Sequence, residues 1–210
     1  MRKKLLSLLF FVVLSAGIFL FTGCKEPLIE KTQVYLYDST SNIILDVVNV
    51  EKGVDVTDDI TECHLNKTGY TFICWSYDKE GENPVDFTKG FTGDRVNIYA
   101  IYEINKYNIV YNVMVYNDDI DKYEYVRDGE GFSTQQYEYG SMFNLPTGKN
   151  SSGELYPNFI KEGYTFVGWT TEIITDETID VSDKLYIPGS QYSLSTASDV
   201  NFYAYFVSNS

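Results

Sequence analysis

The sequence has very few of the residues from which most catalytic and metal sites are built. Its 210 residues include a single histidine, His64, and three cysteines. A site with several histidine ligands, or a catalytic triad that contains histidine, therefore has too few parts. Cys63 directly precedes His64, but neighbours in sequence rarely face one another as a nucleophile and its base must. We therefore expect no catalytic residue, no cofactor and no metal site.

Phosphate-binding motifs are missing from the sequence as well. It contains no glycine-rich loop ending in Lys-Ser or Lys-Thr, and no dinucleotide-binding fingerprint. Basic residues are scarce, with 16 Lys and Arg against 30 Asp and Glu, for a net charge of −14. A surface this acidic repels phosphate backbones, so we expect no nucleic-acid partner. The excess charge is typical of a soluble protein that repels its neighbours at a crowded surface.

The acidic residues leave two kinds of chemistry to consider. Asp118, Asp119 and Asp121 lie in one polar turn, but this turn lacks the spacing, the central glycine and the closing glutamate of a calcium loop. We interpret it as a solvated hairpin tip, with weak calcium binding as the alternative. A carboxylate pair for glycoside hydrolysis is an open alternative among 30 acids, but small domains offer no obvious deep cleft for it.

The N-terminal segment is typical of a secretory signal. Basic residues at positions 2–4 precede an apolar run over residues 5–20, and small residues lead to Cys24. The Thr-Gly-Cys sequence at its end resembles a bacterial lipoprotein signal, although Phe21 stands where that family usually has leucine. In that family the cysteine thiol receives a diacylglyceryl group, and cleavage makes the cysteine the new N-terminus. A plain transmembrane anchor is the alternative.

The resemblance implies a signal peptide over residues 1–23, lipidation at Cys24 and a short tether over residues 24–32. The membrane partner would be reached through lipid on Cys24, with the folded part close to the bilayer. Each buried methylene of an acyl chain contributes about 0.8 kcal/mol, so several chains hold a small protein to a membrane. We therefore expect a lipid anchor in the bacterial cell envelope and an outward-facing position on the cell surface.

The rest of the chain is rich in aromatic residues, with 19 Tyr and 13 Phe, and it repeats one aromatic motif. Gly-Tyr-Thr-Phe-Ile-Cys-Trp at residues 69–75 returns as Gly-Tyr-Thr-Phe-Val-Gly-Trp at residues 163–169, and the two copies hold both tryptophans. Aromatic and β-branched residues favour strands, and a repeat of this length predicts a chain built twice on one plan. We expect these motif residues to be structural: Gly69, Tyr70, Phe72, Trp75, Gly163, Tyr164, Phe166 and Trp169. The alternative for the tryptophans is an exposed platform for stacking sugars.

Strand-like sequence surrounds each copy of the motif. A hairpin is predicted before the first copy, followed by a short helix within residues 54–65 that Thr57 caps. Alternating residues at 95–102 and 200–206 predict a closing strand in each copy. The sequence predicts two domains, at residues 33–105 and 106–210, and the boundary at 103–106 is too short for a flexible linker. The second copy has longer loops, including ten extra residues between motif and closing strand.

The order of hairpin, Lys-x-Gly-Tyr-Thr-Phe-x-Gly-Trp and closing Tyr-Ala strand resembles the Listeria–Bacteroides repeat, also called the internalin-B-type B-repeat. Lys67 and Lys161 open the two motifs, while Cys74 replaces the usual glycine in the first. Tyr102 and Phe206 stand where the family usually closes on tryptophan. The resemblance implies an α+β, β-dominated fold of two tandem, small β-grasp-like repeat domains. Family members often serve as stalks or adhesive modules on bacterial surfaces.

Cys63 and Cys74 remain once Cys24 is assigned to lipid. Outside the cytoplasm two thiols commonly pair, and a Cys63–Cys74 disulfide would tie the expected helix to the motif strand. Such a bond would contribute roughly 2–3 kcal/mol. Two small buried thiols are an equally good interpretation. Mass analysis with and without reductant distinguishes them.

Two function hypotheses follow, and both involve binding without chemistry. The first is a surface lipoprotein whose repeats act as an adhesion, interaction or spacer module through strand edges, loops or aromatic patches. The second is a glycan-binding module for nutrient capture or cell-wall contact, for which coplanar exposed aromatics on one face would be the signature. The partner, protein or glycan, is therefore expected at the cell surface, and specificity is expected in the loops where the copies differ.

Overall fold

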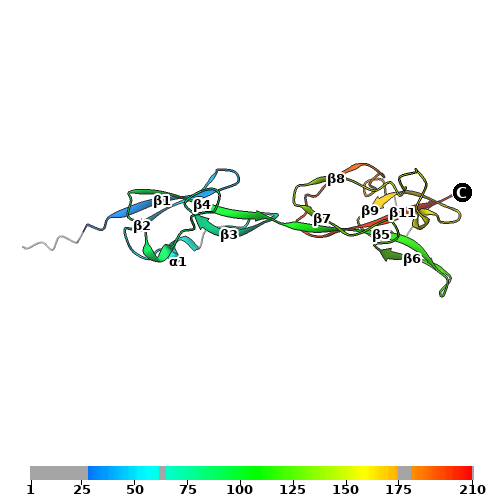
Figure 1. Ribbon diagram of the computed structural model, residues 1–210, viewed down its shortest axis with the longest axis horizontal. Coiled ribbons are helices and arrows are strands. Elements are labelled where there is room, and N and C mark those ends of the chain that lie inside the picture. Colours follow the sequence, from blue (N-terminus) through cyan, green and yellow to red (C-terminus); the bar gives the residue numbers. More distant parts are fainter. Residues whose placement is uncertain (1–27, 62–64, 175–180, 210) are drawn as a thin grey trace, which may run out of the picture.

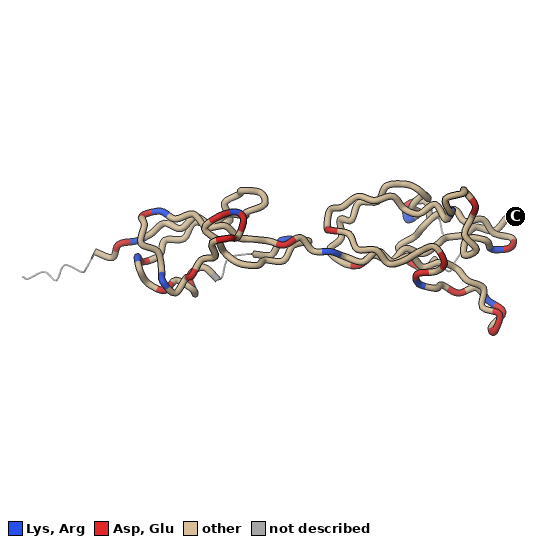
Figure 2. Tube along the Cα trace, in the orientation of Figure 1, with Lys and Arg blue, Asp and Glu red and all other residues tan. Residues whose placement is uncertain are grey.

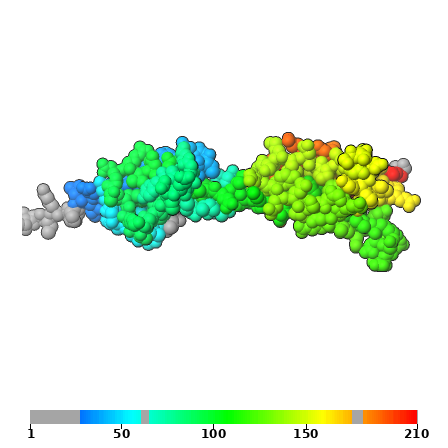
Figure 3. Space-filling model, in the orientation of Figure 1, coloured from blue at the N-terminus to red at the C-terminus, as the bar shows by residue number. Residues whose placement is uncertain are grey.

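A computed structural model describes residues 28–61, 65–174 and 181–209. Two β-rich bodies lie in line and are joined by a narrow neck (Figures 1 and 3). We call the body that holds β1 to β4 repeat 1 and the body that holds β5 to β11 repeat 2. Cys24, Cys63 and His64 lie outside the described residues, so the predictions made for them stay predictions.

Repeat 1 is a mixed four-stranded sheet in the order β2-β1-β4-β3. Its first and last strands, β1 and β4, are parallel neighbours, and the other pairs are antiparallel. The helix predicted before the motif is present but short, and Asp55, rather than Thr57, accepts the backbone N–H at its start (2.9 Å). The elements are β1 (Lys31–Asp38), β2 (Ile44–Glu51), α1 (Thr57–Thr61), β3 (Tyr70–Ser76), the 3-10 helix η1 (Phe87–Lys89) and β4 (Arg95–Ile104).

Repeat 2 rebuilds this plan with more parts. Its main sheet runs β6-β5-β11-β9, β7 also pairs with β5, and the first and last strands, β5 and β11, are again parallel. A separate two-stranded sheet joins β8 and β10. The elements are β5 (Lys106–Asn117), β6 (Lys122–Arg127), β7 (Gln135–Glu138), β8 (Met142–Asn144), η2 (Pro157–Phe159), β9 (Tyr164–Thr170), β10 (Gln191–Ser193) and β11 (Val200–Ser208).

A β-bulge in each motif strand decides which way the tryptophan points. Strict alternation from Phe72 would place Trp75 on the opposite face of the sheet. The register shifts between Phe72 and Cys74, so Ile73 is the extra residue, and Trp75 returns to the core side with its ring 5.8 Å from Phe72. Repeat 2 has the same register shift, between Phe166 and Gly168, and the ring centroids of Phe166 and Trp169 lie 5.5 Å apart.

Each repeat has its own hydrophobic core. In repeat 1 Val56 lies just before α1 and Ile60 lies within it, and both pack with Trp75 beneath the sheet. In repeat 2 Trp169 packs with Phe159 of η2 and Phe202 of β11. The prediction of a β-dominated chain with mixed sheets and a helix is confirmed, and the β-grasp detail stays a prediction.

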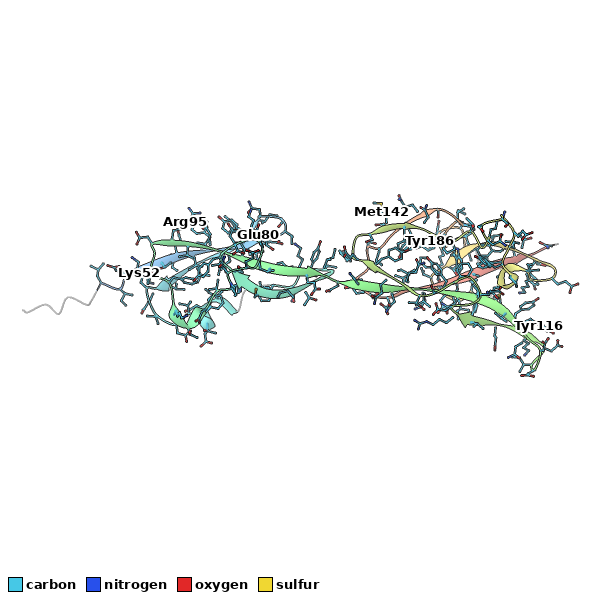
Figure 4. All side chains as sticks on the ribbon, viewed as in Figure 1. Lys52, Glu80, Arg95, Tyr116, Met142 and Tyr186 are labelled. Carbon is cyan, nitrogen blue, oxygen red and sulfur yellow. The ribbon has the colours of Figure 1, made fainter. Side chains whose placement is uncertain are left out.

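The residue before the motif tryptophan is Cys74 in repeat 1 and Gly168 in repeat 2. The longer loop of repeat 2 explains this difference. Tyr186, labelled in Figure 4, exchanges backbone hydrogen bonds with Trp169 at 2.9 and 2.8 Å. A Cβ on Gly168 would lie 2.5 Å from the Tyr186 carbonyl oxygen. Repeat 2 therefore needs glycine here, because its inserted segment crosses the strand closely. At Cys74 repeat 1 tolerates a side chain.

The two repeats are joined by one nearly unbroken strand. Asn105 is the only residue between β4 and β5. Its N–H donates to the Gly69 carbonyl (2.9 Å), and its own carbonyl accepts from the Tyr139 N–H (2.9 Å). Thr71 adds a hydroxyl hydrogen bond to the Asn105 side chain (2.6 Å). The neck is thus hydrogen-bonded to both repeats.

The Tyr139 ring packs this junction from the side of repeat 2. It lies over Gly69 and meets the Tyr70 ring edge-on, with centroids 6.3 Å apart. A Cβ on Gly69 would lie 2.1 Å from the Tyr139 ring. Gly69 has φ +77°, a value that glycine adopts without strain. Glycine is therefore required here for its backbone angle and for the close approach of the ring.

We predict that Gly69→Asn opens the junction while Gly163→Asn does not. Asparagine tolerates positive φ, and both glycines have it, at +77° and +74°. The new side chain would overlap Tyr139 in the first variant and meets open space in the second. Urea denaturation should show a loss of about 1–3 kcal/mol for Gly69→Asn and a change within about 0.5 kcal/mol for Gly163→Asn. Equal losses would contradict the packing described.

Candidate interaction surfaces

The tryptophans of the two motifs lie in the cores of the repeats. Trp75 is 5% exposed and Trp169 is fully buried. The Trp169 indole N–H donates to the Pro146 carbonyl at 2.8 Å, so its polar atom is also used inside the fold. Both tryptophan rings are thus buried in the cores, so neither is exposed as a platform for a sugar.

The lysines that precede the motifs also have structural partners. Lys67 lies 2.8 Å from the Asp38 carboxylate and 4.6 Å from the centroid of the Tyr70 ring. Lys161 lies 3.6 Å from the centroid of the Tyr164 ring. Each ammonium group therefore packs on the motif tyrosine. Lys67 also has the Asp38 carboxylate as a partner.

Asp38 is a largely buried acidic group with several hydrogen-bond partners. Its carboxylate accepts from the Thr40 and Ser41 N–H groups (2.7 and 3.2 Å) and so holds the β1–β2 turn. Burial acts to raise its pKa, but the hydrogen bonds from Lys67, Thr40 and Ser41 outweigh burial and lower the pKa of Asp38 to about 2. This carboxylate links the hairpin turn to the start of the motif.

Cys74 lies on the face of the sheet opposite Trp75 and is half-buried there. The core and α1 lie on the Trp75 side. Its predicted disulfide partner, Cys63, lies outside the described residues. The pairing of the two therefore stays a prediction, to be settled by mass analysis.

The open face of the repeat 1 sheet carries a row of tyrosines. Tyr35 and Tyr37 alternate with the buried Val34 and Leu36 along β1, and Tyr99 lies beside Tyr37 on β4. The ring planes are nearly parallel: Tyr35 and Tyr37 differ by 21° and Tyr37 and Tyr99 by 27°, with centroids 6.5 and 5.4 Å apart. We call these three residues the tyrosine face.

Cations and apolar groups border the tyrosine face. The Arg95 guanidinium lies 3.8 Å from the centroid of the Tyr35 ring, and the Lys79 ammonium lies 5.8 Å from that of Tyr99. Figure 4 shows Arg95 near the end of repeat 1 that lies away from repeat 2. On β2, Val47 pairs with Tyr35 and is exposed. The surface thus combines parallel rings, cationic groups and an exposed apolar edge strand.

Sequence analysis did not single out the tyrosine face. The alternation of Tyr35 and Tyr37 with apolar residues was visible, but the contribution of Tyr99 depends on the parallel pairing of β1 with β4. Repeat 2 lacks this row: the same registers place Val110, Asn112 and Tyr203 at the equivalent positions. The face is therefore specific to repeat 1.

Repeat 2 contains a cleft of about 550 Å³ between its longer loops. Aromatic rings form one part of its lining, and amide and hydroxyl groups form another. Burial raises the pKa of Tyr111, which stays neutral in this wall. The lining includes Tyr111, Phe132, Tyr156, Gln135, Asn144 and Lys149. The cleft lies among the loops of repeat 2, and the expectation that specificity resides in such loops stays a prediction.

The acidic turn predicted as a hairpin tip lies between β5 and β6. Asp118 and Asp119 are exposed there, and Figure 2 shows acidic residues gathered at this tip, away from both cores. Asp121 accepts a hydrogen bond from the Tyr116 hydroxyl. Among the described residues, no three His, Cys, Asp or Glu side chains are grouped as ligands for a metal ion.

In residues 28–61, 65–174 and 181–209, no helix has the length and apolar character needed to cross a membrane.

Comparison with known proteins points to one family. The family model of the Listeria–Bacteroides repeat domain matches residues 36–101 and 122–205, one match in each repeat. A protein of Evansella cellulosilytica named "Putative membrane protein" is 26% identical over 162 residues, which cover 77% of this chain and 20% of that protein. A "Putative Gly-rich membrane protein" of the same organism is 28% identical over 140 residues, 63% of this chain and 13% of that protein. The chain thus spans a fifth or less of either relative.

We predict that Asp38→Asn removes a stabilisation that depends on pH. The pKa of Asp38 is lowered in the folded state, so its contribution is complete above the ordinary pKa near 3.8 and is lost as the pH falls towards 2. The shift corresponds to about 2 kcal/mol. Urea denaturation should show wild type more stable than Asp38→Asn by that amount at pH 7, with the difference largely gone at pH 2. Asp118→Asn, at the hairpin tip, is the control, and a gap that persists at pH 2 would refute the assignment.

Proposed function

Because this chain belongs to the Listeria–Bacteroides repeat family, we propose that it is a bacterial surface lipoprotein whose two repeats form a non-catalytic interaction or spacer module. The family is one of non-catalytic repeat modules. The names of the two relatives place them in membranes. A surface repeat protein is the description that both findings support.

The observation that carries the proposal is the hydrogen-bonded junction. Asn105 bonds to Gly69 on one side and to Tyr139 on the other. A flexible linker would let the repeats reorient, whereas this neck holds the second repeat in line with the first (Figure 1). A rod of this kind sets a distance between its two ends, as a spacer requires. The tyrosine face gives it a surface for contact.

The N-terminal sequence supports a lipid anchor for this rod. A basic head, an apolar run and Thr-Gly-Cys precede the tether, and the folded residues begin within a few positions of Cys24. Repeat 1 would then lie nearest the bilayer, and the C-terminal end of repeat 2 would point away from it. This arrangement gives an outward-facing protein in the cell envelope.

We predict that Cys24→Ala abolishes lipid attachment. Acylation requires the thiol, so metabolic labelling with palmitate should mark the wild type and not the variant. The variant should also leave the membrane fraction, because acyl chains supply the anchoring free energy. Cys74→Ala is the matched control and should keep its label. Palmitate incorporation that survives Cys24→Ala would refute the anchor.

A second candidate function is glycan binding, and the tyrosine face favours it. The half-buried rings of Tyr35, Tyr37 and Tyr99 lie on the open sheet face and offer aromatic surface to a sugar ring. The cleft of repeat 2 offers a second location, since it combines aromatic walls with amide groups. Either location would convert the spacer into a capture module for nutrient or cell-wall glycans.

One binding screen separates these proposals. The chain from residue 25 onward is applied to an array of bacterial and host glycans and host surface proteins. If the tyrosine face binds a glycan, the double variant Tyr35→Ala/Tyr37→Ala should weaken it about tenfold or more, since each stacked ring contributes about 1 kcal/mol or more. Tyr156→Ala, in the cleft, should leave it unchanged. The reverse pattern would move the site to the cleft, and silence across the array would favour the spacer.

A further inference from the structure

The cleft of repeat 2 lies among loops that hydrogen bonds hold in place. The Tyr156 N–H donates to the Gly148 carbonyl (2.9 Å), and the Phe132 N–H donates to the Gly129 carbonyl (2.9 Å). The cleft volume of about 550 Å³ falls within the roughly 300–1,000 Å³ that is usual for small-molecule sites. Repeat 2 thus contains a cleft of ligand size whose loops are tied to one another.

Aromatic rings form one wall of this cleft. The Phe132 ring meets the Tyr156 ring edge-on, with centroids 5.6 Å apart, and its centroid lies 6.0 Å from that of Tyr111. The Tyr156 ring lies over Gly131, where a Cβ would be 2.5 Å from it. Phe132 and Tyr156 are half-buried, so part of each ring stays accessible. Accessible rings of this kind can pack against the apolar C–H face of a sugar.

Polar side chains form another part of the lining. Ser133, Gln135, Asn144 and Thr147 border the cleft, and all four are exposed. The Gln135 side-chain oxygen accepts from the Tyr137 hydroxyl (2.6 Å), so a hydrogen bond within the fold orients this amide. Amide and hydroxyl groups both donate and accept hydrogen bonds, as the hydroxyls of a sugar require. The cleft therefore combines ring surface with hydrogen-bonding groups.

Tyr111 places a buried hydroxyl beside the cleft. The residue is 3% exposed, and its ring packs on Trp169 and Phe202 in the core. In the part of the chain that the structure describes, no group is hydrogen-bonded to this hydroxyl, although every fully enclosed side-chain oxygen or nitrogen there has a partner. The Tyr111 hydroxyl is therefore not enclosed, and the cleft is the open space that Tyr111 borders. A ligand that bonds to it would remove the cost of a largely buried polar group without a partner.

The core does not need a hydroxyl at this position. Tyr111 pairs with Phe202 of β11 as Leu36 pairs with Ile98 of β4, so the two residues are equivalent. Leu36 is fully buried and fills the position with apolar atoms alone. Burial raises the pKa of Tyr111, so its hydroxyl stays protonated and keeps a hydrogen to donate. Repeat 2 thus presents a hydrogen-bond donor that packing does not explain.

The charge of the cleft is opposite in sign to that of the chain. The lining that the structure describes includes one lysine, Lys149, and no aspartate or glutamate, in a chain with 30 acids. Lys149 is exposed and takes part in none of the ion pairs formed by the described residues. Glu154, on the same hairpin, accepts from the Asn150 amide (3.4 Å). The Lys149 ammonium is therefore available to an anionic group of a ligand.

We propose that the cleft of repeat 2 binds a sugar that carries a carboxylate group. The aromatic wall packs on the sugar ring, the Tyr111 hydroxyl and the amides bond to the sugar hydroxyls, and the Lys149 ammonium pairs with the carboxylate. The inference rests on glycan binding, the second candidate function, and names the class of sugar. It concerns the cleft alone and makes no use of the tyrosine face or the lipid anchor.

Acidic sugars and neutral counterparts are the probes for this site. Glucuronate, galacturonate and N-acetylneuraminate, and separately glucose and galactose, are added at constant ionic strength to the ¹⁵N-labelled chain from residue 25 onward. The amide signals of residues 131–135 and 144–149 should shift with at least one acidic sugar. The neutral sugars should bind at least tenfold more weakly, because they offer no carboxylate to Lys149. Acetate should cause no such shift, since it has no ring to pack on the aromatic wall.

Lys149→Met removes the proposed partner of the carboxylate. The affinity for the acidic sugar should fall about tenfold, while the affinity for neutral sugars should stay unchanged. Lys122→Met is the matched control, because Lys122 is also exposed, its loss changes the net charge equally, and it lies on β6 outside the lining. Equal losses in the two variants would show an effect of net charge and overturn the role of Lys149.

Tyr111→Phe removes only a hydroxyl, and its stability separates a role in binding from a role in folding. The acidic sugar should bind about five- to tenfold more weakly. The midpoint of urea denaturation should stay the same or rise, since the described residues provide this hydroxyl with no partner. Tyr125→Phe is the control: its hydroxyl donates to the Ala204 carbonyl (3.0 Å), so its midpoint should fall and its binding should not change. A lower midpoint for Tyr111→Phe, or unchanged binding, would overturn the role of Tyr111.

The pattern of shifts distinguishes a failure of this proposal from a failure of glycan binding. Equal binding of acidic and neutral sugars in the cleft would overturn the carboxylate and leave glycan binding in place. Shifts confined to the tyrosine face would overturn the cleft as the site and also leave glycan binding in place. No shift with any of these sugars up to about 10 mM would overturn the inference and favour the spacer.

Discussion

The parallel pairing of the first and last strands in each repeat determines the shape of the whole molecule. β1 and β4 run side by side in the same direction, as do β5 and β11. Parallel neighbours need a crossover, so the chain enters a repeat at one end and leaves it at the other. Consecutive repeats built this way must follow one another in line. The elongated form in Figure 1 is a consequence of strand direction.

The same pairing explains how much could be predicted from the sequence. The motif strands, the hairpins and the short boundary at Asn105 rest on local patterns, and the structure places strands and turns there. We expected Trp75 in the core, and it lies there because a bulge at Ile73 turns it inward. Strict alternation along the strand would have placed it on the opposite face. Bulges depend on the partner strand, and one sequence does not reveal its register.

The tyrosine face and the packing at Gly69 were hidden for a related reason. Tyr99 is more than sixty positions from Tyr37, and only the register of β1 with β4 brings their rings together. The role of Gly69 likewise depends on Tyr139, a residue of the other repeat. The repetition of Gly69 at Gly163 was visible in the sequence, but the contact of Gly69 with the Tyr139 ring was not.

The through-going strand also determines how the molecule responds to a mechanical load. A pull between the start of β1 and the end of β4 draws two parallel neighbours in opposite directions. Their hydrogen bonds are then loaded together, in shear, and must break together. Strands peeled apart at one end would instead lose their bonds one at a time. Because Asn105 passes the load directly into β5, each repeat would resist tension along its strongest axis.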